Sequence, residues 1–152
     1  MQPLSLDWRF LWLCFEKIGI AWILVFPAGW WSEKQGNFVG IRTFPLVAMA
    51  SCGYVLLADK AAGGDATTRS HIIQGLTTGI GFIGGGAIMR SRGNVHGTAT
   101  AASIWNTGVI GAAVAESRFE IAVILSLLNL ITLHLLVPRR ERAGHAGQAA
   151  PK

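Results

Sequence analysis

Charged residues are scarce in this chain: 14% of its 152 residues are Asp, Glu, Lys or Arg, against about 25% in an average soluble domain. Cysteine is scarce too. Cys14 and Cys52 stand singly within apolar runs, a pattern typical of small buried hydrophobes rather than of redox or metal sites. The four histidines lack the spacing of metal ligands. Because the sequence also offers no nucleophile–base pair, we expect no enzymatic activity, no cofactor and no metal site.

Apolar residues make up 51% of the chain and gather in five segments, at about 10–31, 44–58, 72–89, 98–115 and 119–137. A helix needs about 20 predominantly apolar residues to cross a bilayer. We therefore predict an all-α membrane protein, with a compact bundle of about five transmembrane helices in residues 1–138 that contacts the lipid bilayer. The small, polar and basic residues 139–152 are expected to form a disordered cytoplasmic tail.

The first segment is expected to be a retained span rather than a cleaved signal peptide. Glu16 and Lys17 interrupt its apolar centre, and the paired Trp30 and Trp31 at its far end are typical of an interfacial belt. Adjacent residues on a helix do not face each other. We therefore expect Lys17 to extend outward to the interface and Glu16 to face the bundle, either as a tolerated charge or with a proton or cation role.

The distribution of the basic residues predicts the orientation. The net charge is +5, but the basic residues lie singly or in pairs beside apolar segments, which argues against nucleic-acid binding. Eight lysines and arginines fall on the side of the C-terminus and four on the side of the N-terminus, and Lys17 within the first span completes the 13. The richer side should be cytoplasmic, so we expect the N-terminus outside and the C-terminus inside, in a bacterial inner membrane.

A stretch dense in glycine and alanine follows His71 and contains Gly-Ile-Gly-Phe-Ile-Gly-Gly-Gly at 79–86. Its match to G-x-G-x-x-G lacks the strand–helix context of a dinucleotide site. In a bilayer such residues let helix backbones approach closely. We expect this helix to pack on two faces and to be central in the bundle; alternatively, the last three glycines break the helix and turn backbone groups toward a polar cavity. The glycines form two groups at helical spacing, Gly75, Gly79 and Gly86 on one side and Gly81, Gly84 and Gly85 on the other.

The fourth segment has a small-residue stripe, in which Ala99, Ser103, Thr107, Gly111 and Ala115 recur every four residues. Its hydroxyl and amide groups predict either hydrogen bonds between helices or a polar vestibule for an ion or a partner. These groups belong to Thr98, Thr100, Ser103, Asn106 and Thr107. Only Glu16 of the eight acidic residues lies clearly within the membrane, so a carboxylate-lined path for magnesium is poorly supported.

Three motifs follow one another along the chain. The first is Ile-Arg-Thr-Phe-Pro-Leu-Val at 41–47, which includes Arg42 and Thr43; the second is Ile-Gln-Gly at 73–75 leading into the glycine run; the third is Val-His-Gly-Thr-Ala-Thr-Ala-Ala-Ser-Ile-Trp, which ends at Trp105. Together they resemble the motifs of the MgtC/SapB family, over roughly residues 33–123. The resemblance implies a five-span bacterial inner-membrane protein of the short type, without the soluble C-terminal domain of longer members.

One element departs from the family pattern. The family places Asp-x-x-Arg just before the Ile-Gln-Gly element, whereas here His71 stands nearest the arginine position and Asp65 and Arg69 lie slightly upstream. We treat these three residues and Arg42 as candidate polar functional groups. Arg42 is expected either to anchor the topology or to bind an anionic group or cap helix ends.

The resemblance also implies a function connected with growth at low magnesium and with survival inside host cells. We expect a non-enzymatic protein that regulates a membrane partner, the ATP synthase or a transporter. A homo-oligomer is a further expectation. The alternative from another class is a small magnesium-linked ion channel or transporter subunit that uses the glycine break of the third segment.

Overall fold

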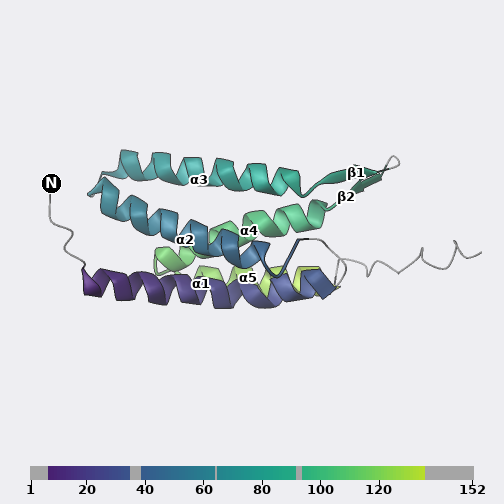
Figure 1. Ribbon diagram of the computed structural model, residues 1–152, viewed down its shortest axis with the longest axis horizontal. Helices are drawn as coiled ribbons and strands as arrows, with labels where there is room; N and C mark the ends of the chain where they lie inside the picture. The colour runs from purple at the N-terminus through teal and green to yellow at the C-terminus, as the bar shows by residue number, and fades with distance from the viewer. Residues whose placement is uncertain (1–6, 35–38, 64, 92–93, 136–152) are drawn as a thin grey trace, which may run out of the picture.

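The computed structural model describes residues 7–34, 39–63, 65–91 and 94–135. Figure 1 shows that successive helices run in alternating directions, so that the ends of neighbouring helices meet at two opposite ends of the bundle. The expected tail at 139–152 lies outside the described residues. The helices are α1 (Trp8–Lys34), α2 (Thr43–Ala62), α3 (Ala66–Gly86), α4 (Thr98–Ala115) and α5 (Phe119–Leu135).

The helix boundaries follow the expected segments most closely at α4, which spans the predicted residues 98–115. The largest difference is at α3, which begins at Ala66 rather than near residue 72. Asp65 explains the earlier start because its carboxylate accepts hydrogen bonds from the backbone N–H groups of Thr67, at 3.2 Å, and Thr68, at 2.9 Å. This N-cap satisfies donors that the first turn of a helix leaves free.

A short β-hairpin joins α3 to α4 and was not predicted. Strand β1 (Met89–Ser91) pairs antiparallel with β2 (Asn94–His96), so the fold is a helical bundle with one small two-stranded element. Gly97 then turns the chain into α4 with φ of +86°, a conformation that favours glycine. A methyl group there would lie 3.2 Å from the carbonyl carbon of Ala87 and closer still to its oxygen.

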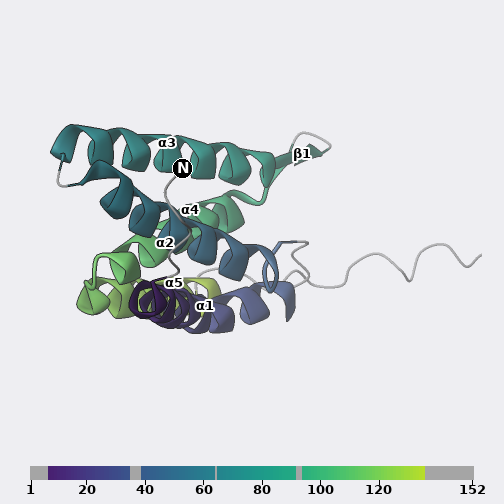
Figure 2. The same ribbon diagram turned by 60° about the vertical axis from the view of Figure 1, so that its left-hand side comes forward.

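Three layers make up the bundle, and α2 and α4 form the middle one (Figure 2). The two middle helices touch backbone to backbone: a methyl group on Gly111 would lie 2.9 Å from the carbonyl carbon of Ala48. Helices α1 and α5 cover one side of this layer, and α3 covers the other. The core is therefore centred on α2 and α4.

The expectation of a central third helix is wrong within this chain. In α3 the described buried residues are Ile80 and Gly84. Gly84 packs closely, since a methyl group there would lie 3.2 Å from the carbonyl oxygen of Ala101 in α4. A methyl group at any other glycine of α3 would meet none of the described atoms within 4 Å, apart from near neighbours in its own helix. These open positions are Gly75, Gly79, Gly81, Gly85 and Gly86.

The alternative of a broken third helix is also not what the structure has. Helix α3 continues through Gly84 and Gly85 and ends at Gly86. The carbonyl oxygens of Gly84 and Gly85 accept hydrogen bonds from the N–H groups of Ala87, at 3.0 Å, and Ile88, at 3.1 Å. These two carbonyl oxygens are therefore hydrogen-bonded within the C-terminal end of the helix and do not turn toward a polar cavity.

Large apolar side chains cover the outside of the bundle, including Phe15 at 71% exposed and Phe82 at 86%. Such a surface is unusual for a soluble monomer and suits lipid. Two of the described helices, α1 and α2, are long and apolar enough to cross a membrane. Two cation–π contacts mark opposite ends of α1: Lys60 lies over Phe10 at 4.0 Å and Lys34 over Trp30 at 4.3 Å. These contacts fit the aromatic and basic residues of membrane interfaces.

Candidate functional site

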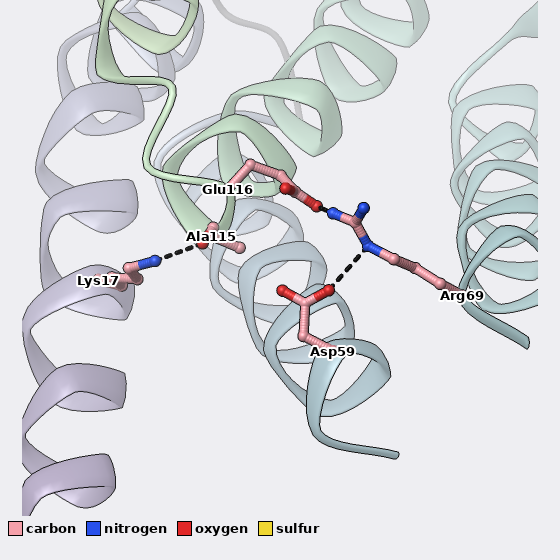
Figure 3. Close-up of polar contacts among 5 residues, drawn as sticks. All are labelled: Lys17, Asp59, Arg69, Ala115 and Glu116. Carbon is pink, nitrogen blue, oxygen red and sulfur yellow. Dashed lines mark hydrogen bonds and ion pairs between the residues drawn. The ribbon is translucent and has the colours of Figure 1, made fainter. Parts of the chain in front are cut away.

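A charged cluster joins three helices at the end of the bundle where α3 begins (Figure 3). Its centre is Arg69, whose Nε lies 2.8 Å from Oδ1 of Asp59 in α2. Its Nη2 pairs with Oε1 of Glu116, at the end of α4. All three side chains are between 34% and 43% exposed. The contact with Asp59 is an ion pair without hydrogen-bond geometry, so charge attraction rather than a directed bond holds it.

The positions of these residues in their helices explain why they meet. Asp59 lies in the last turn of α2, Arg69 in the first turn of α3, and Glu116 is the C-cap of α4. The alternating directions of the helices bring these three positions to one end of the bundle. We call the ion-paired set Asp59, Arg69 and Glu116 the Arg69 cluster.

Lys17 supports the cluster from α1, because its ammonium donates a hydrogen bond to the carbonyl oxygen of Ala115, next to Glu116 (Figure 3). A cation at the C-terminal end of α4 also interacts favourably with the helix dipole. The expectation for the adjacent pair in α1 is therefore wrong. Lys17 turns into the bundle, whereas Glu16 is exposed, because the carbonyl end of α4 offers the lysine a partner and the carboxylate none.

The other predicted polar candidates do not join this cluster. Asp65 is fully engaged as the N-cap of α3, and the hydroxyl and N–H of Thr68 are the main reason why the pKa of this carboxyl lies below its ordinary value. His71 is exposed in the second turn of α3, two residues after Arg69. Arg42 occupies the N-cap position of α2, where its exposed side chain makes no capping hydrogen bond to the described backbone, and Thr43 is half-buried in the first turn.

An apolar groove runs between α2 and α3, and two of the open glycines line it. Its volume is about 540 Å³. Gly75 and Gly79 line it from α3, and Val47, Ser51 and Tyr54 line it from α2. Because glycine has no side chain, the backbone of α3 is accessible from this groove. A helix with small residues of its own could approach α3 closely there.

The polar residues of α4 are mostly engaged inside the bundle. The hydroxyl of Ser103 donates to Oδ1 of Asn129 in α5 at 2.9 Å, and both side chains are buried. Nδ2 of Asn106 donates to the carbonyl oxygen of Leu125 at 3.3 Å. These bonds tie α4 to α5, whereas the vestibule interpretation would need such groups to be accessible. Of the remaining candidates in α4, Thr100 is buried, and Thr98 and Trp105 are exposed.

The chemistry of the described residues is that of ion pairs and helix contacts. They hold no group of three or more His, Cys, Asp or Glu side chains arranged to hold a metal ion. Asp59 and Glu116 were not among the predicted site residues. The signal was present in the sequence, because the expected spans place Asp59, Arg69 and Glu116 at segment ends on the same side of the membrane.

The chain is similar in sequence to one family of proteins and to several of its relatives. The model of the MgtC family matches residues 18–142. The chain is 33% identical to Protein SrpB of Synechococcus elongatus over 113 residues, 66% of this chain and 62% of that protein. It is 30% identical to "Putative magnesium transporter YhiD" of Escherichia coli K12 over 110 residues, 68% of this chain and 51% of that protein. It is 27% identical to Protein MgtC of Brucella abortus over 110 residues, 72% of this chain and 45% of that protein.

The chain thus spans about half to three-fifths of the length of these relatives. No solved structure matches it.

Proposed function

Because the chain belongs to the MgtC family of membrane proteins, we propose that it is a non-enzymatic, multi-pass protein of the bacterial inner membrane that binds and regulates another integral membrane protein. The regulated partner is a transporter or the ATP synthase, and the setting is adaptation to low magnesium or intracellular survival. The name of one relative, "Putative magnesium transporter YhiD" of Escherichia coli, supports the connection with magnesium.

The observation that carries the proposal is the uncovered glycine face of α3 beside the α2–α3 groove. Gly75 and Gly79 line this groove, and a methyl group at either would meet no other described part of the chain within 4 Å. Between helices in lipid, association depends on close packing rather than on a hydrophobic driving force. An open glycine face is therefore a surface for a partner's helix, and the occupant we propose is one transmembrane helix with small residues at four-residue spacing.

The membrane arrangement in the proposal has five spans, with the N-terminus outside and the C-terminus in the cytoplasm. The alternating helix directions support five crossings, and the excess of basic residues on the side of the C-terminus supports the orientation. In this arrangement the Arg69 cluster lies on the outer side. Reporter enzymes fused after the described ends of α2 and α4 test it, because both fusions should report the outer side.

Photo-crosslinking in native membranes tests the proposed surface. A photoreactive amino acid at Ile83, in the groove, should give one discrete adduct with a membrane protein, whereas the same residue at Leu127, exposed on α5, should give none. Gly79→Leu should fill the groove and remove both the adduct and growth at low magnesium, with normal amounts of protein. An adduct that persists in Gly79→Leu, or equal labelling from Leu127, would contradict the proposal.

Magnesium-linked transport is the second candidate, favoured by the name of the Escherichia coli relative. Purified protein reconstituted in liposomes distinguishes the two functions. Magnesium flux above that of empty vesicles, lost in Gly79→Leu, would support transport. Absence of flux together with the crosslinked adduct would support the regulatory function.

A further inference from the structure

We infer that the Arg69 cluster is a latch that holds the first half of α3 against the middle layer and thereby sets the width of the α2–α3 groove. Arg69 is the element of the latch that belongs to α3, and Asp59 and Glu116 belong to the middle helices α2 and α4. The inference concerns the chain alone and does not depend on the proposed function.

The first half of α3 is weakly packed. None of residues 66–75, all of which the structure describes, is buried. Ile72 is half-buried, but it lines the open groove rather than a filled core. Few apolar contacts and exposed surroundings are the features of segments that open at low free-energy cost. The ion pairs of Arg69 are therefore a large part of what holds this half in place.

The second half of α3 is held differently. Ile80 is buried in one apolar cluster with Val47 of α2 and Ile104 of α4, and the backbone of Gly84 lies close against Ala101. These contacts fix one end of α3. At the other end the N–H of Asp65 donates a hydrogen bond to the carbonyl oxygen of Ala62, at 2.8 Å, which ties the start of α3 to the end of α2, and the ion pairs of the latch hold the first turns beyond it. Loss of the latch should thus swing the first half about the contact at Gly84 and widen the groove.

Asp59 and Glu116 are held in place by α2 and α4, so when the ion pairs break it is α3 that moves. Asp59 lies within the continuous helix α2. Glu116 is held by its own N–H bond to the carbonyl oxygen of Ala112, at 3.1 Å, and by the bond from Lys17 to Ala115. Because the three side chains of the latch are half-exposed, ions in the surrounding water screen their attraction.

Distance measurements between spin labels test the latch in the full chain, with Cys14 and Cys52 replaced by alanine. One label pair, at Trp12 and Ile73, reports the latch end of α3; a second pair, at Ile23 and Phe82, reports the other end. All four positions are exposed. Arg69→Gln should raise the population of long distances at the latch end about five-fold, the factor expected for two half-exposed ion pairs, and leave the second pair unchanged.

The control is Arg118→Gln, which removes the same charge at the same end of the bundle. Arg118 is 69% exposed, and it pairs at 3.9 Å with Glu120, only two residues along the chain in the first turn of α5, so the pair ties no two helices together. This variant should keep both distance distributions of the parent protein. Salt at 1 M should broaden the latch-end distances of the parent and leave those of Arg69→Gln unchanged.

The salt dependence of the parent protein keeps the inference testable if Arg69→Gln does not fold, because latch-end distances that stay unchanged in 1 M salt would overturn it. A charge exchange adds a further test. Arg69→Glu combined with Glu116→Arg restores one pair with reversed charges, so it should show narrower latch-end distances than Arg69→Glu alone. Unchanged distances in Arg69→Gln, or equal broadening at both ends of α3, would overturn the latch. So would a charge exchange that gives no recovery.

Discussion

The contact between Gly111 and Ala48 allows a sharp test of the fold. A methyl group at Gly111 would lie 2.9 Å from the carbonyl carbon and 3.0 Å from the Cα of Ala48, whereas unstrained carbon atoms lie about 3.5–4.0 Å apart. Both are backbone atoms of α2, so no side chain can rotate away. Gly111→Ala must therefore move the two middle helices apart by several tenths of an ångström.

The expected cost is about 1–3 kcal/mol, the usual range for an overfilled contact. The matched control is Gly79→Ala in α3, where the added methyl group meets open space. This control carries the same gain in helix propensity, about 1 kcal/mol in water. The free energy of unfolding, measured by titrating dodecyl sulfate into dodecyl maltoside micelles, should fall for Gly111→Ala and stay level or rise for Gly79→Ala.

A second substitution separates a backbone clash from a side-chain clash. Ala48→Gly removes the side chain opposite Gly111 but leaves the backbone atoms in place, so it should not restore the stability of Gly111→Ala. If Gly111→Ala is as stable as Gly79→Ala, or if Ala48→Gly rescues it, then α2 and α4 do not touch through their backbones and do not form the middle layer of the bundle.

Three other predictions follow from local contacts. Asp65 has a lowered pKa because Thr68 donates hydrogen bonds to its charged form. Its contribution to stability is therefore fully present above its ordinary pKa of 3.8 and is lost as the pH falls through the lower pKa of the folded protein. Asp65→Asn, which can still cap the helix, should remove this part of the pH dependence of stability, measured by unfolding at a series of acidic pH values. Ser103→Ala should lower the free energy of unfolding by about 0.6 kcal/mol, the mean for hydrogen bonds between membrane helices, because it leaves Asn129 without its donor. Gly85→Leu should assemble normally, judged by size-exclusion chromatography, because open space surrounds this position; aggregation would show that α3 is covered there.

The sequence predicts the number, order and approximate ends of the helices because apolar segments of sufficient length are a strong signal. The start of α3 was missed, although Asp is one of the residues that commonly cap the N-terminus of a helix, and Asp65 stands directly before Ala66. The hairpin was missed because its strands, Met89–Ser91 and Asn94–His96, are too short for a period-of-two pattern to be visible.

The position of each helix in the bundle could not be predicted. Small residues show that a helix can be approached closely, but they do not show by which neighbour. Gly111 in α4 meets another helix of the same chain, whereas Gly79 in α3 meets none of the described ones. A helix that is apolar on all sides also gives no inward direction, which is why Glu16 and Lys17 were assigned to the wrong faces.

The Arg69 cluster was partly within reach of the sequence. Arg69 was a candidate through the family motif, but the carboxylates that pair with it come from helix ends distant in the chain, at Asp59 and Glu116. The expected spans place all three residues on one side of the membrane, yet the pairing depends on which helices lie next to α3 in three dimensions. Sequence therefore indicates the residue, and the fold supplies its partners.

The two cation–π contacts on α1 have a consequence for the lipids around the protein. Phe10 and Trp30 lie about 30 Å apart along the helix axis at 1.5 Å per residue, which equals the thickness of an ordinary hydrocarbon layer. Vesicles made from shorter acyl chains would force this helix to tilt. Because Lys60 of α2 lies over the ring of Phe10, α2 would tilt together with α1. The protein should therefore be sensitive to the acyl-chain length of the surrounding lipids.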